Sequence, residues 1–336
     1  MDQVAVRYGL DIAKRIFAVY GVNASEKQVV SKVISRTKVL SYFAGLPPAI
    51  IGIESCAGSH YWARELTKLG HEVRLINSKF VIPYRRKGKN DLNDAEAICE
   101  AVGRPGMMFV AHKSEEQQSI LMAHRIRNQC IASRTALINQ IHAHLLEFGF
   151  VVSKGRHKMK RELHEIIGED ALPPIVEELL HSLLVALARV DEDIERLDRM
   201  IESWVRNSVV ATRLLQLDGV GPLTASAVAA TVGDPKVFKN GRQMAAWLGL
   251  VPRQNSSGGK NKLGGITKAG DRYLRMLLVH GARTVLLMSR RGNAKYQDWI
   301  DGLRSRRPDN VVVVAYAAKQ ARMIWAVMMG EQSTAC

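Results

Sequence analysis

The stretch VAVRYGLDIA, residues 4–13, is apolar and β-branched enough to form a buried β-strand, yet it carries Asp11 near its end. A carboxylate inside an apolar strand is costly to bury unless its charge is compensated. Two further segments rich in Val and Ile follow, RIFAVYGV (15–22) and KQVVSKVIS (27–35), broken by the turn-like NASEK. We therefore predict three consecutive strands. The charge of Asp11, near the end of the first strand, must be compensated if the residue is buried.

Helices and strands then alternate along the chain. The expected elements are, in order, a short helix near residues 38–45, the strand AIIGIES (49–55), the helix HYWARELTKLG (60–70), the strand HEVRLIN (71–77), the basic linker IPYRRKGK (82–89) and the helix DLNDAEAICEAV (91–102). Three strands followed by helix, strand, helix, strand and helix is an order typical of an α/β domain.

Composition indicates the class of partner. The chain has 336 residues, and 48 Lys and Arg against 32 Asp and Glu leave a net charge of +16. This excess favours nucleic acid as a partner over a membrane surface. Four scattered cysteines without a CxxC pair predict neither a zinc site nor a disulfide framework, which suits a reducing cytoplasm. Charged residues interrupt the start of the chain and the apolar stretch 311–329, so we expect neither a signal peptide nor a membrane span.

The middle of the chain is expected to be helical. Residues 115–148 form one poorly amphipathic helical segment, and two prolines at 173 and 174 precede the next helix. In that helix apolar residues alternate at spacings of four and three, which is an a/d seam over about four heptads. The seam consists of Val176, Leu180, Leu183, Leu187, Val190, Ile194, Leu197, Ile201 and Trp204. A hairpin with the preceding helix and a seam between two chains explain this pattern equally well.

The last third contains a candidate phosphate-binding turn and a basic region. LLQLDGVGPLTASAVAA (214–230) matches the helix-hairpin-helix pattern, in which a tight turn at Gly219 and Gly221 presents helix N–H groups to a phosphate. A plain helix turn would look the same. Residues 253–307 are strongly basic, which favours a nucleic-acid footprint. The contacts expected there are Arg253, Lys260, Lys262, Lys268, Arg272 and Arg275.

Four acids stand at the ends of predicted elements. Asp11 and Glu54 lie near the ends of two strands, and Asp91 and Asp94 share one face at the start of a helix. Taken singly, each has an ordinary explanation: Asp91 or Asp94 as a helix cap, and Glu54 as a cap of the helix that follows it. Taken together, they form a set that could hold two Mg²⁺ ions for a phosphodiester displacement.

The stretch PRQNSSGGKNKLGG, residues 252–265, suits neither a helix nor a strand. One interpretation is a plain surface loop. In the other, the glycines let the backbone approach a phosphate, the lysines neutralise it and a serine attacks it.

These motifs together resemble one family over essentially the whole chain. The D…E…DxxD acids resemble the RuvC-like branch of the ribonuclease H fold. GLDIAK, IESCAGSHYWARELTKLG and KNDLNDAEAI resemble the first domain of the DEDD transposases of the insertion-sequence one-hundred-and-ten family. GVGPLTASAVAA, the segment 247–282 and KQARMIWAVMM resemble its second domain, and IHAHLLEFGF resembles its eleven-eleven subgroup. After Glu54 the chain has Ser-Cys-Ala-Gly where Ala-Thr-Gly is commoner, a departure that touches no acid.

The resemblance implies an architecture and a mechanism. It implies an α/β RuvC-like domain over residues 1–110, a helical coiled-coil hairpin over 111–208, and a mostly α transposase domain with the helix-hairpin-helix and serine loop over 209–336. It places Mg²⁺ on the four acids and makes Ser257 the nucleophile that forms a covalent phosphoserine with DNA. It also implies a structured bridge RNA that pairs with donor and target DNA, a dimer that assembles into a tetramer, and a cytoplasmic, nucleoid-associated bacterial protein.

Two other functions fit parts of the sequence. A metal-dependent nuclease that hydrolyses DNA junctions with water needs the acids but not Ser257. A non-catalytic DNA- or RNA-binding protein needs only the hairpin and the basic region, and would tolerate loss of any one acid.

Overall fold

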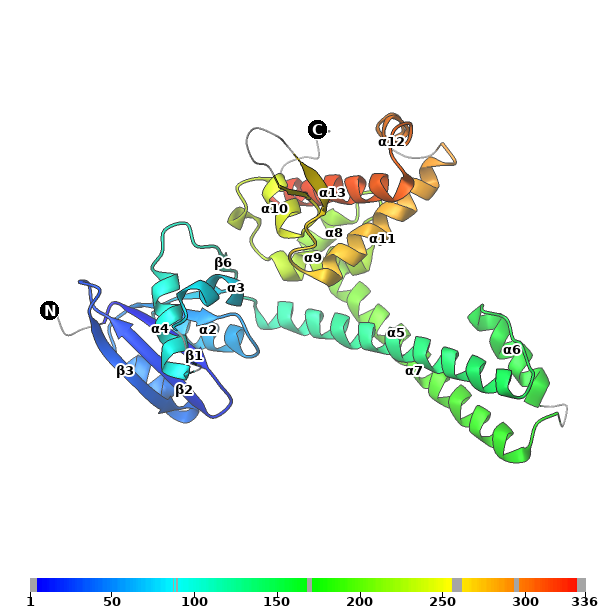
Figure 1. Cartoon of the computed structure of the whole chain (residues 1–336), viewed down its shortest axis with the longest axis horizontal. Coiled ribbons are helices and arrows are strands. Elements are labelled where there is room, and N and C mark those ends of the chain that lie inside the picture. The colour runs from blue at the N-terminus through cyan, green and yellow to red at the C-terminus, as the bar shows by residue number, and fades with distance from the viewer. Residues whose placement is uncertain are drawn as a thin grey trace. The chain divides into compact units, whose positions relative to one another are not determined.

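The protein is described here from a computed structural model that covers residues 5–86, 88, 90–167, 171–255, 262–292 and 296–330. The chain forms two compact units (Figure 1). The N-terminal unit comprises Met1–Glu116 together with Val232–Val237, and the C-terminal unit comprises Gln117–Thr231 and Phe238–Cys336. The three-part division expected from the sequence stays a prediction.

The N-terminal unit is built on a six-stranded mixed sheet with the order β3-β2-β1-β4-β5-β6. Its strands are β1 (Arg7–Ile12), β2 (Ile16–Val22), β3 (Gln28–Ser35), β4 (Ile50–Glu54), β5 (Glu72–Ile76) and β6 (Phe109–Val110). The strands β1, β4 and β5 run parallel to one another, while β2, β3 and β6 pair antiparallel to their neighbours. The five longer strands lie where the sequence predicted them, and β6 was not anticipated.

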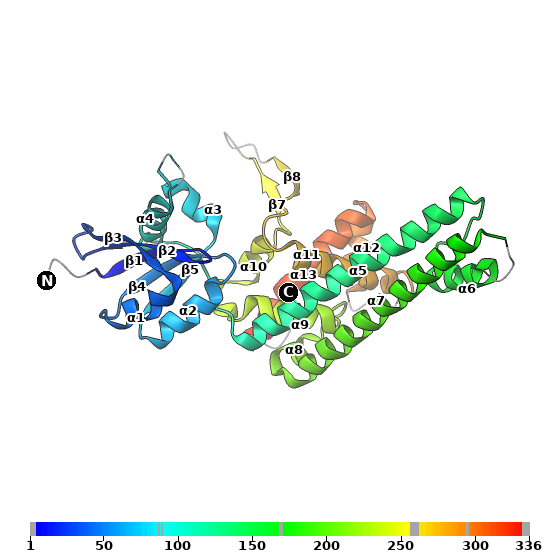
Figure 2. The same ribbon diagram turned by 90° about the horizontal axis from the view of Figure 1, so that it is seen from below.

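Helices cover both faces of this sheet. They are α1 (Val39–Ala44), α2 (Ser59–Lys68), α3 (Ser78–Val81) and α4 (Asp91–Val102), with 3-10 turns at Arg36–Lys38 and Ile82–Tyr84. One core contains Tyr8 and Leu10 of β1 together with apolar side chains of α1 and α2. Because side chains alternate along a strand, Gly9 and Asp11 face the other way, toward α4. Figures 1 and 2 show α2 and α4 on opposite faces of the sheet.

Two glycines allow α4 to lie unusually close to the sheet. Gly9 of β1 and Gly52 of β4 are paired neighbours in the ladder, and both face α4. A Cβ on Gly9 would lie 1.9 Å from the carbonyl oxygen of Ala95, and one on Gly52 would lie 2.9 Å from the Cβ of Val102. Only residues without a side chain permit this approach. The glycines therefore determine how near α4 brings its own first turn to the strand ends.

The C-terminal unit is mostly helical. Its helices are α5 (Glu115–Glu147), α6 (Arg156–Ile167), α7 (Pro174–Asn207), α8 (Val209–Leu214), α9 (Pro222–Val232), α10 (Gly241–Trp247), α11 (Arg272–Ser289), α12 (Gln297–Arg304) and α13 (Asp309–Met328), with a 3-10 turn at Pro235–Val237 and a two-stranded ladder of β7 (Pro252–Gln254) and β8 (Leu263–Ile266). The first two residues of α5, Glu115 and Glu116, the last residue of α9, Val232, and the whole turn Pro235–Val237 belong to the N-terminal unit. A mixed α/β sheet followed by a mostly helical remainder is the architecture expected from the sequence.

The long helices α5 and α7 pack against each other in antiparallel orientation (Figure 2). Near one end, Ile120 of α5 shares a core with Ile201 of α7, and near the other Leu145 shares one with Leu180. Each fully buried apolar side chain of this kind contributes about 1.5–3 kcal/mol. Within the described residues, the apolar face of α7 is therefore covered by α5 of the same chain, as in the intramolecular hairpin. The seam between two chains stays a prediction.

An acid with three cationic partners ties α6 to this pair of helices. Asp191 of α7 accepts from Arg156 Nη1 at 2.7 Å and Lys160 Nζ at 2.9 Å, and Arg134 Nη1 of α5 lies 3.5 Å away. Burial raises the pKa of Asp191, but the hydrogen bonds and charges of Lys160 and Arg156 outweigh it and hold the pKa below its usual value. On α7, Asp191 lies between Leu187 of one apolar cluster and Leu197 of the other, so the ion pairs link the helices between these clusters.

A buried polar network joins α5 to the C-terminal helices. The ring of His124 lies between the Tyr273 hydroxyl at 3.0 Å and the Ser226 Oγ at 2.9 Å. Ser226 Oγ donates to the carbonyl of Pro222, so it accepts from His124 Nε2 and leaves Nδ1 to accept from Tyr273. Burial lowers the pKa of His124 to about 4, which keeps the ring neutral and the network satisfied.

The turn at Gly219 has a structural reason of its own. Gly219 has a φ of +77°, and a Cβ there would lie 2.6 Å from the carbonyl oxygen of Gly281 in α11. A Cβ on Gly281 would lie 2.0 Å from the carbonyl oxygen of Gly219. The two glycines allow the backbones of the turn and of α11 to touch. By contrast, a Cβ on Gly221 would meet open space, so its backbone is accessible.

The apolar helix near the C-terminus is packed against its neighbours. Of the described helices, α13 alone is long and apolar enough to cross a membrane. It packs on α10 and α11, and Val312, Tyr316 and Ile324 are fully buried there. This agrees with the expectation of a packed helix.

Candidate functional site

The strand acids are brought together by the register of the sheet. β1 and β4 are parallel, and Leu10 pairs with Ile53 at the end of their ladder. The next residue of each strand is an acid, Asp11 on β1 and Glu54 on β4. Each acid comes two residues after a glycine that faces α4, and side chains two residues apart on a strand share a face, so both carboxylates lie on the α4 side of the sheet. Asp11 and Glu54, which are 43 positions apart in the sequence, thus become neighbours through the pairing of β1 with β4.

The helix acids are free to complete this group because another residue caps the helix. The side chain of Asn90 accepts from the N–H of Leu92 at 3.0 Å and is the N-cap of α4. Neither Asp91 nor Asp94 is needed for that purpose, so the capping alternative does not account for them. Oxygen atoms of Asp11, Asp91 and Asp94 all lie within 4.8 Å of one another. The first turn of α4 therefore carries two carboxylates to the end of β1.

Glu54 belongs to the same corner but is held by an arginine. The α2 helix begins after Gly58, whose φ is +91°, and has no side-chain cap, so Glu54 does not act as that cap. Instead Arg85 Nη2 donates to Glu54 Oε2 at 2.8 Å, and Arg85 Nε lies 3.0 Å from Asp94 Oδ1. We call Asp11, Glu54, Asp91 and Asp94 the acid quartet. Arg85 bridges two of its members.

The electrostatics of the quartet favour a bound cation. Burial, followed by the negative charges of the other three carboxylates, raises the pKa of Asp11 from 3.8 to about 6, and Arg85 opposes this shift. Carboxylates crowded in this way repel one another unless a positive charge lies between them.

The donor set of the quartet fits a hard divalent cation. Its ligands are carboxylate oxygens, which Mg²⁺ prefers, and no histidine or cysteine takes part in the described group. Three oxygens within 4.8 Å of one another can converge on one ion without a change in the backbone. The residues present therefore fit a metal-binding role, and their oxygen ligands favour a hard divalent cation such as Mg²⁺.

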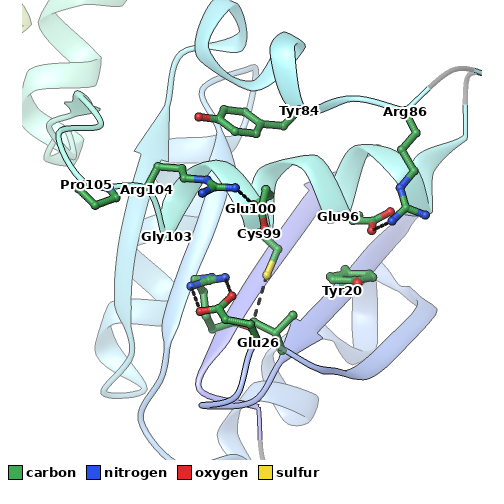
Figure 3. A pocket seen from close by; sticks show the side chains of 12 residues that line it. Tyr20, Glu26, Tyr84, Arg86, Glu96, Cys99, Glu100, Gly103, Arg104 and Pro105 are labelled. Carbon is green, nitrogen blue, oxygen red and sulfur yellow. Dashed lines mark hydrogen bonds and ion pairs between the residues drawn. The ribbon is translucent and has the colours of Figure 1, made fainter.

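A polar pocket on the other flank of α4 contrasts with this group (Figure 3). Each of its three arginines is paired with a glutamate. The pairs are Arg7 with Glu26, Arg86 with Glu96 at 2.6 Å, and Arg104 with Glu100. Positive and negative charges therefore balance in the pocket, whereas among the described residues the four acids of the quartet are paired with one arginine, Arg85. The consecutive arginines 85 and 86 contact acids of α4 on its two flanks.

The proposed nucleophile and one of its lysines, Ser257 and Lys260, lie outside the described residues. The ends of their segment are described: β7 and β8 pair antiparallel, and the N–H of Asn255 donates to the carbonyl of Lys262 at 3.0 Å. The expectation that residues 252–265 contain no strand is therefore wrong at both ends. Pro252 is tolerated because it is the first residue of its strand, where no N–H is required. The ladder brings the two ends of the segment together.

The basic residues expected to contact nucleic acid have different surroundings. Arg253, Lys262, Lys268 and Arg272 are exposed. Arg275, by contrast, donates to the carbonyl of Leu248 at 3.1 Å and to that of Ala269 at 3.0 Å. It therefore joins the end of α10 to the start of α11, a structural role that does not require a ligand.

Known proteins resemble both parts of the chain. Residues 8–150 match a family model for DEDD transposases of IS110 elements, described as "Transposase", and residues 211–297 match one described as "Transposase IS116/IS110/IS902 family". A probable family 20 transposase of Pseudomonas aeruginosa is 46% identical over 328 residues, which is 97% of each chain. This chain belongs to the IS110/IS116/IS902 family of transposases. The transposase of IS1328 from Yersinia enterocolitica is 40% identical over 95% of each chain, and that of IS1111A from Coxiella burnetii is 37% identical over 98% of this chain and 91% of its own.

Membership in this transposase family makes the protein an enzyme that acts on DNA as a transposase or recombinase. The non-catalytic alternative is thereby excluded. In this transposase Arg85 was not among the site residues predicted from the sequence, because residues 82–89 were interpreted only as a basic linker. The one available signal was the position of that linker directly before a helix that starts with two acids. Which arginine would turn toward them depends on the path of the chain.

Proposed function

We propose that this transposase is an RNA-guided DNA recombinase that cuts strands with Ser257 and Mg²⁺ held by the acid quartet. The observation that supports this most is the convergence of Asp11, Asp91 and Asp94, with Glu54 beside them, in a chain of this family. We also propose that the N-terminal unit is RuvC-like. In the C-terminal unit, we propose that α5 and α7 form a coiled coil and that the Gly219 turn is part of a helix-hairpin-helix.

The chemistry follows from the residue types. Mg²⁺ on the quartet would withdraw charge from a non-bridging phosphate oxygen and stabilise the developing negative charge. Ser257 gives its proton to solvent water as its Oγ attacks phosphorus, and a P–Oγ bond forms. The bond from phosphorus to the leaving deoxyribose oxygen breaks, and that oxygen takes up a proton. The phosphoserine keeps the free energy of the broken ester, so a hydroxyl of another DNA end can reverse the step without ATP.

The basic residues supply the nucleic-acid contacts in this proposal. Exposed Arg253, Lys262, Lys268 and Arg272 would neutralise backbone phosphates of DNA or of a bridge RNA. We expect binding to duplex DNA to weaken with salt, with a log–log slope of about −0.9 per phosphate contacted. We also expect the purified protein to retain a specific structured RNA. If protein free of RNA is fully active, guidance by RNA is wrong, whereas the proposed DNA cleavage by Ser257 and Mg²⁺ is unaffected.

The decisive experiment compares two adjacent serines. Ser257→Ala should abolish the covalent protein–DNA adduct seen on a denaturing gel with end-labelled DNA. Ser256→Ala is the matched control and should only reduce the amount of adduct. The assignment of the nucleophile is wrong if Ser257→Ala protein forms adduct at the wild-type level.

The same pair of groups allows a test for active sites shared between chains. The quartet belongs to the N-terminal unit and the serine segment to the C-terminal unit. We propose that the serine of one protomer acts at the metals of another, within a dimer that assembles into a tetramer. Mixing Ser257→Ala with Asp11→Ala protein should then restore adduct formation, because one composite site has neither defect. A mixed oligomer without rescue would place both groups in one chain.

A metal-dependent junction nuclease is the second candidate. It is favoured by the fact that the quartet is assembled entirely within the N-terminal unit and needs no hydroxyl nucleophile from the protein. In that case Ser257→Ala protein would still cut junction DNA and release it without an adduct, whereas Asp91→Asn would be inactive.

A further inference from the structure

The positively charged guanidinium group of Arg85 contacts two acids of the quartet, as a bound metal ion would. Its Nη2 donates to Glu54 at 2.8 Å and its Nε lies 3.0 Å from Asp94. The side chains of Glu54 and Asp94 are only 20% and 22% exposed, so neither can replace Arg85 fully with water. In this arrangement Glu54 is committed to a guanidinium group. It cannot give the same oxygen to a metal ion while that contact persists.

The quartet is thereby divided into two unequal halves. Asp11, Asp91 and Asp94 already have oxygens within 4.8 Å of one another. Asp94 Oδ1 contacts Arg85, but the carboxylate has a second oxygen that is available to an ion. Glu54 also keeps a second oxygen, but neither of its oxygens belongs to the converging group, although its strand position is adjacent to Asp11. The contact with Arg85 therefore holds the Glu54 carboxylate outside the group. The arrangement thus offers one preformed cation position and a second that is blocked.

Resting on the proposed function, we propose that Arg85 controls stepwise metal loading. Asp11, Asp91 and Asp94 take a first divalent cation with Arg85 in place. The second cation, which needs Glu54, is admitted only when Arg85 turns away to the phosphate of a bound DNA strand. In the absence of DNA the guanidinium blocks completion of a site that would otherwise be ready to cut.

Guanidinium chemistry makes this exchange possible. A carboxylate and a phosphate offer similar oxygen pairs to the planar fork of Arg, so one partner can replace the other. The Arg85 side chain is 37% exposed, more than either of its acidic partners, and can therefore reach a ligand from solvent. It lies directly after the 3-10 turn Ile82–Tyr84, in extended backbone, and no helix holds it in place. The same arginine then stabilises the negative charge that develops on the phosphate.

The test counts the ions bound by the full chain without nucleic acid. Mn²⁺ serves as the probe, and binding is measured by isothermal titration and by electron paramagnetic resonance of the free ion. We expect one bound Mn²⁺ per chain for the wild type and two for Arg85→Ala, since the two-metal arrangement needs Glu54 released. Adding a DNA duplex should bring the wild type to two. For Arg85→Ala, strand cleavage should nevertheless fall by about 10²–10³-fold, because the phosphate loses a donor.

Arg86→Ala is the matched control. Arg86 is the next residue and also pairs with an α4 acid, Glu96, but on the flank of the pocket in Figure 3. Its variant should bind one Mn²⁺ and cleave DNA like the wild type. An effect of simply loosening the linker would appear in both variants. Higher metal occupancy combined with slower cleavage should appear only in Arg85→Ala.

The outcomes separate the inference from the function on which it rests. Two ions bound by DNA-free wild type, or one by Arg85→Ala, would overturn the role of Arg85 and leave the metal site intact. Asp91→Asn should lose the first ion in both the wild-type and the Arg85→Ala backgrounds. If Asp91→Asn binds Mn²⁺ as well as the wild type does, the quartet is not the metal site and both proposals fail.

Discussion

Replacing Gly9 by alanine should displace α4 and with it half of the acid quartet. The new Cβ would lie 1.9 Å from the carbonyl oxygen of Ala95 and 2.5 Å from the N atom of Cys99, whereas ordinary contact begins at 3.4 Å. Both are backbone atoms, so no side chain can turn aside. Relief of the clash requires α4 to move away from β1 by roughly 1.5 Å.

The expected cost follows from that displacement. Overpacking a close-packed interface costs about 1–3 kcal/mol, and we expect the upper end because both clashing atoms belong to the backbone. For a unit of this size, 3 kcal/mol corresponds to a fall in Tm on the order of 10 °C. A catalytic group misplaced by about 1 Å can lower the rate on the order of 100-fold, and Asp91 and Asp94 move with α4. Cleavage and Mn²⁺ binding should therefore weaken together.

The assay combines thermal unfolding, hydrogen exchange of α4 amides and Mn²⁺ titration. Gly45→Ala is the control in the same unit, because its Cβ would meet Tyr42 O at 3.7 Å and its φ is −83°. Without a clash, Gly→Ala changes stability by less than about 1 kcal/mol, commonly upward. If Gly9→Ala matches Gly45→Ala in Tm, in α4 exchange and in Mn²⁺ affinity, the close approach of α4 does not position the quartet.

Three further variants test the electrostatics and the polar networks. Folding raises the pKa of Asp11 from 3.8 to about 6, so the ionised carboxylate destabilises the folded state above that pH. In metal-free buffer at pH 8, Asp11→Asn should therefore be more stable than wild type by about 1 kcal/mol, after allowance for solvent screening. Below about pH 4, where Asp11 is protonated in both states, the two proteins should be equally stable. Replacing His124 by Leu leaves the half-buried Tyr273 hydroxyl without its partner and should cost about 2 kcal/mol in urea unfolding at neutral pH; no loss would mean that water replaces the ring. Asp191→Ala leaves three cations without their shared acid and should cost about 2 kcal/mol, whereas Asp193→Ala, which loses one exposed ion pair, should stay within about 0.5 kcal/mol.

Local sequence was sufficient for the elements that carry the acids. The helix predicted over residues 91–102 is α4, because Asn90 supplies a side-chain cap and Gly103 follows its last residue. The strand predicted around Asp11 is β1, since its apolar residues alternate toward a core that any α/β sheet provides. These preferences act within a few residues, so they can be recognised without knowing the rest of the fold.

The α5–α7 region shows where local pattern stops being sufficient. The heptad spacing predicted an apolar face on α7, and Leu180, Leu187 and Ile201 are buried. The spacing could not identify the partner, because α5 of the same chain and a helix of a second chain would bury the same stripe. Two features of the tertiary structure make α5 the partner of α7. The chain reverses direction so that the two helices lie antiparallel, and Arg134 of α5 contacts Asp191 of α7.

The order of residues is enough to identify the possible metal ligands, since oxygen donors at strand ends and at a helix start can be recognised in it. Their convergence depends on how the strands and the helix pack. Parallel pairing sets Glu54 beside Asp11, and the missing side chains of Gly9 and Gly52 let α4 approach close enough to add two carboxylates. Arg85 reaches Glu54 across 31 positions of sequence. Such contacts have no local signature, because their energy depends on distances that exist only after the sheet and the helix have packed.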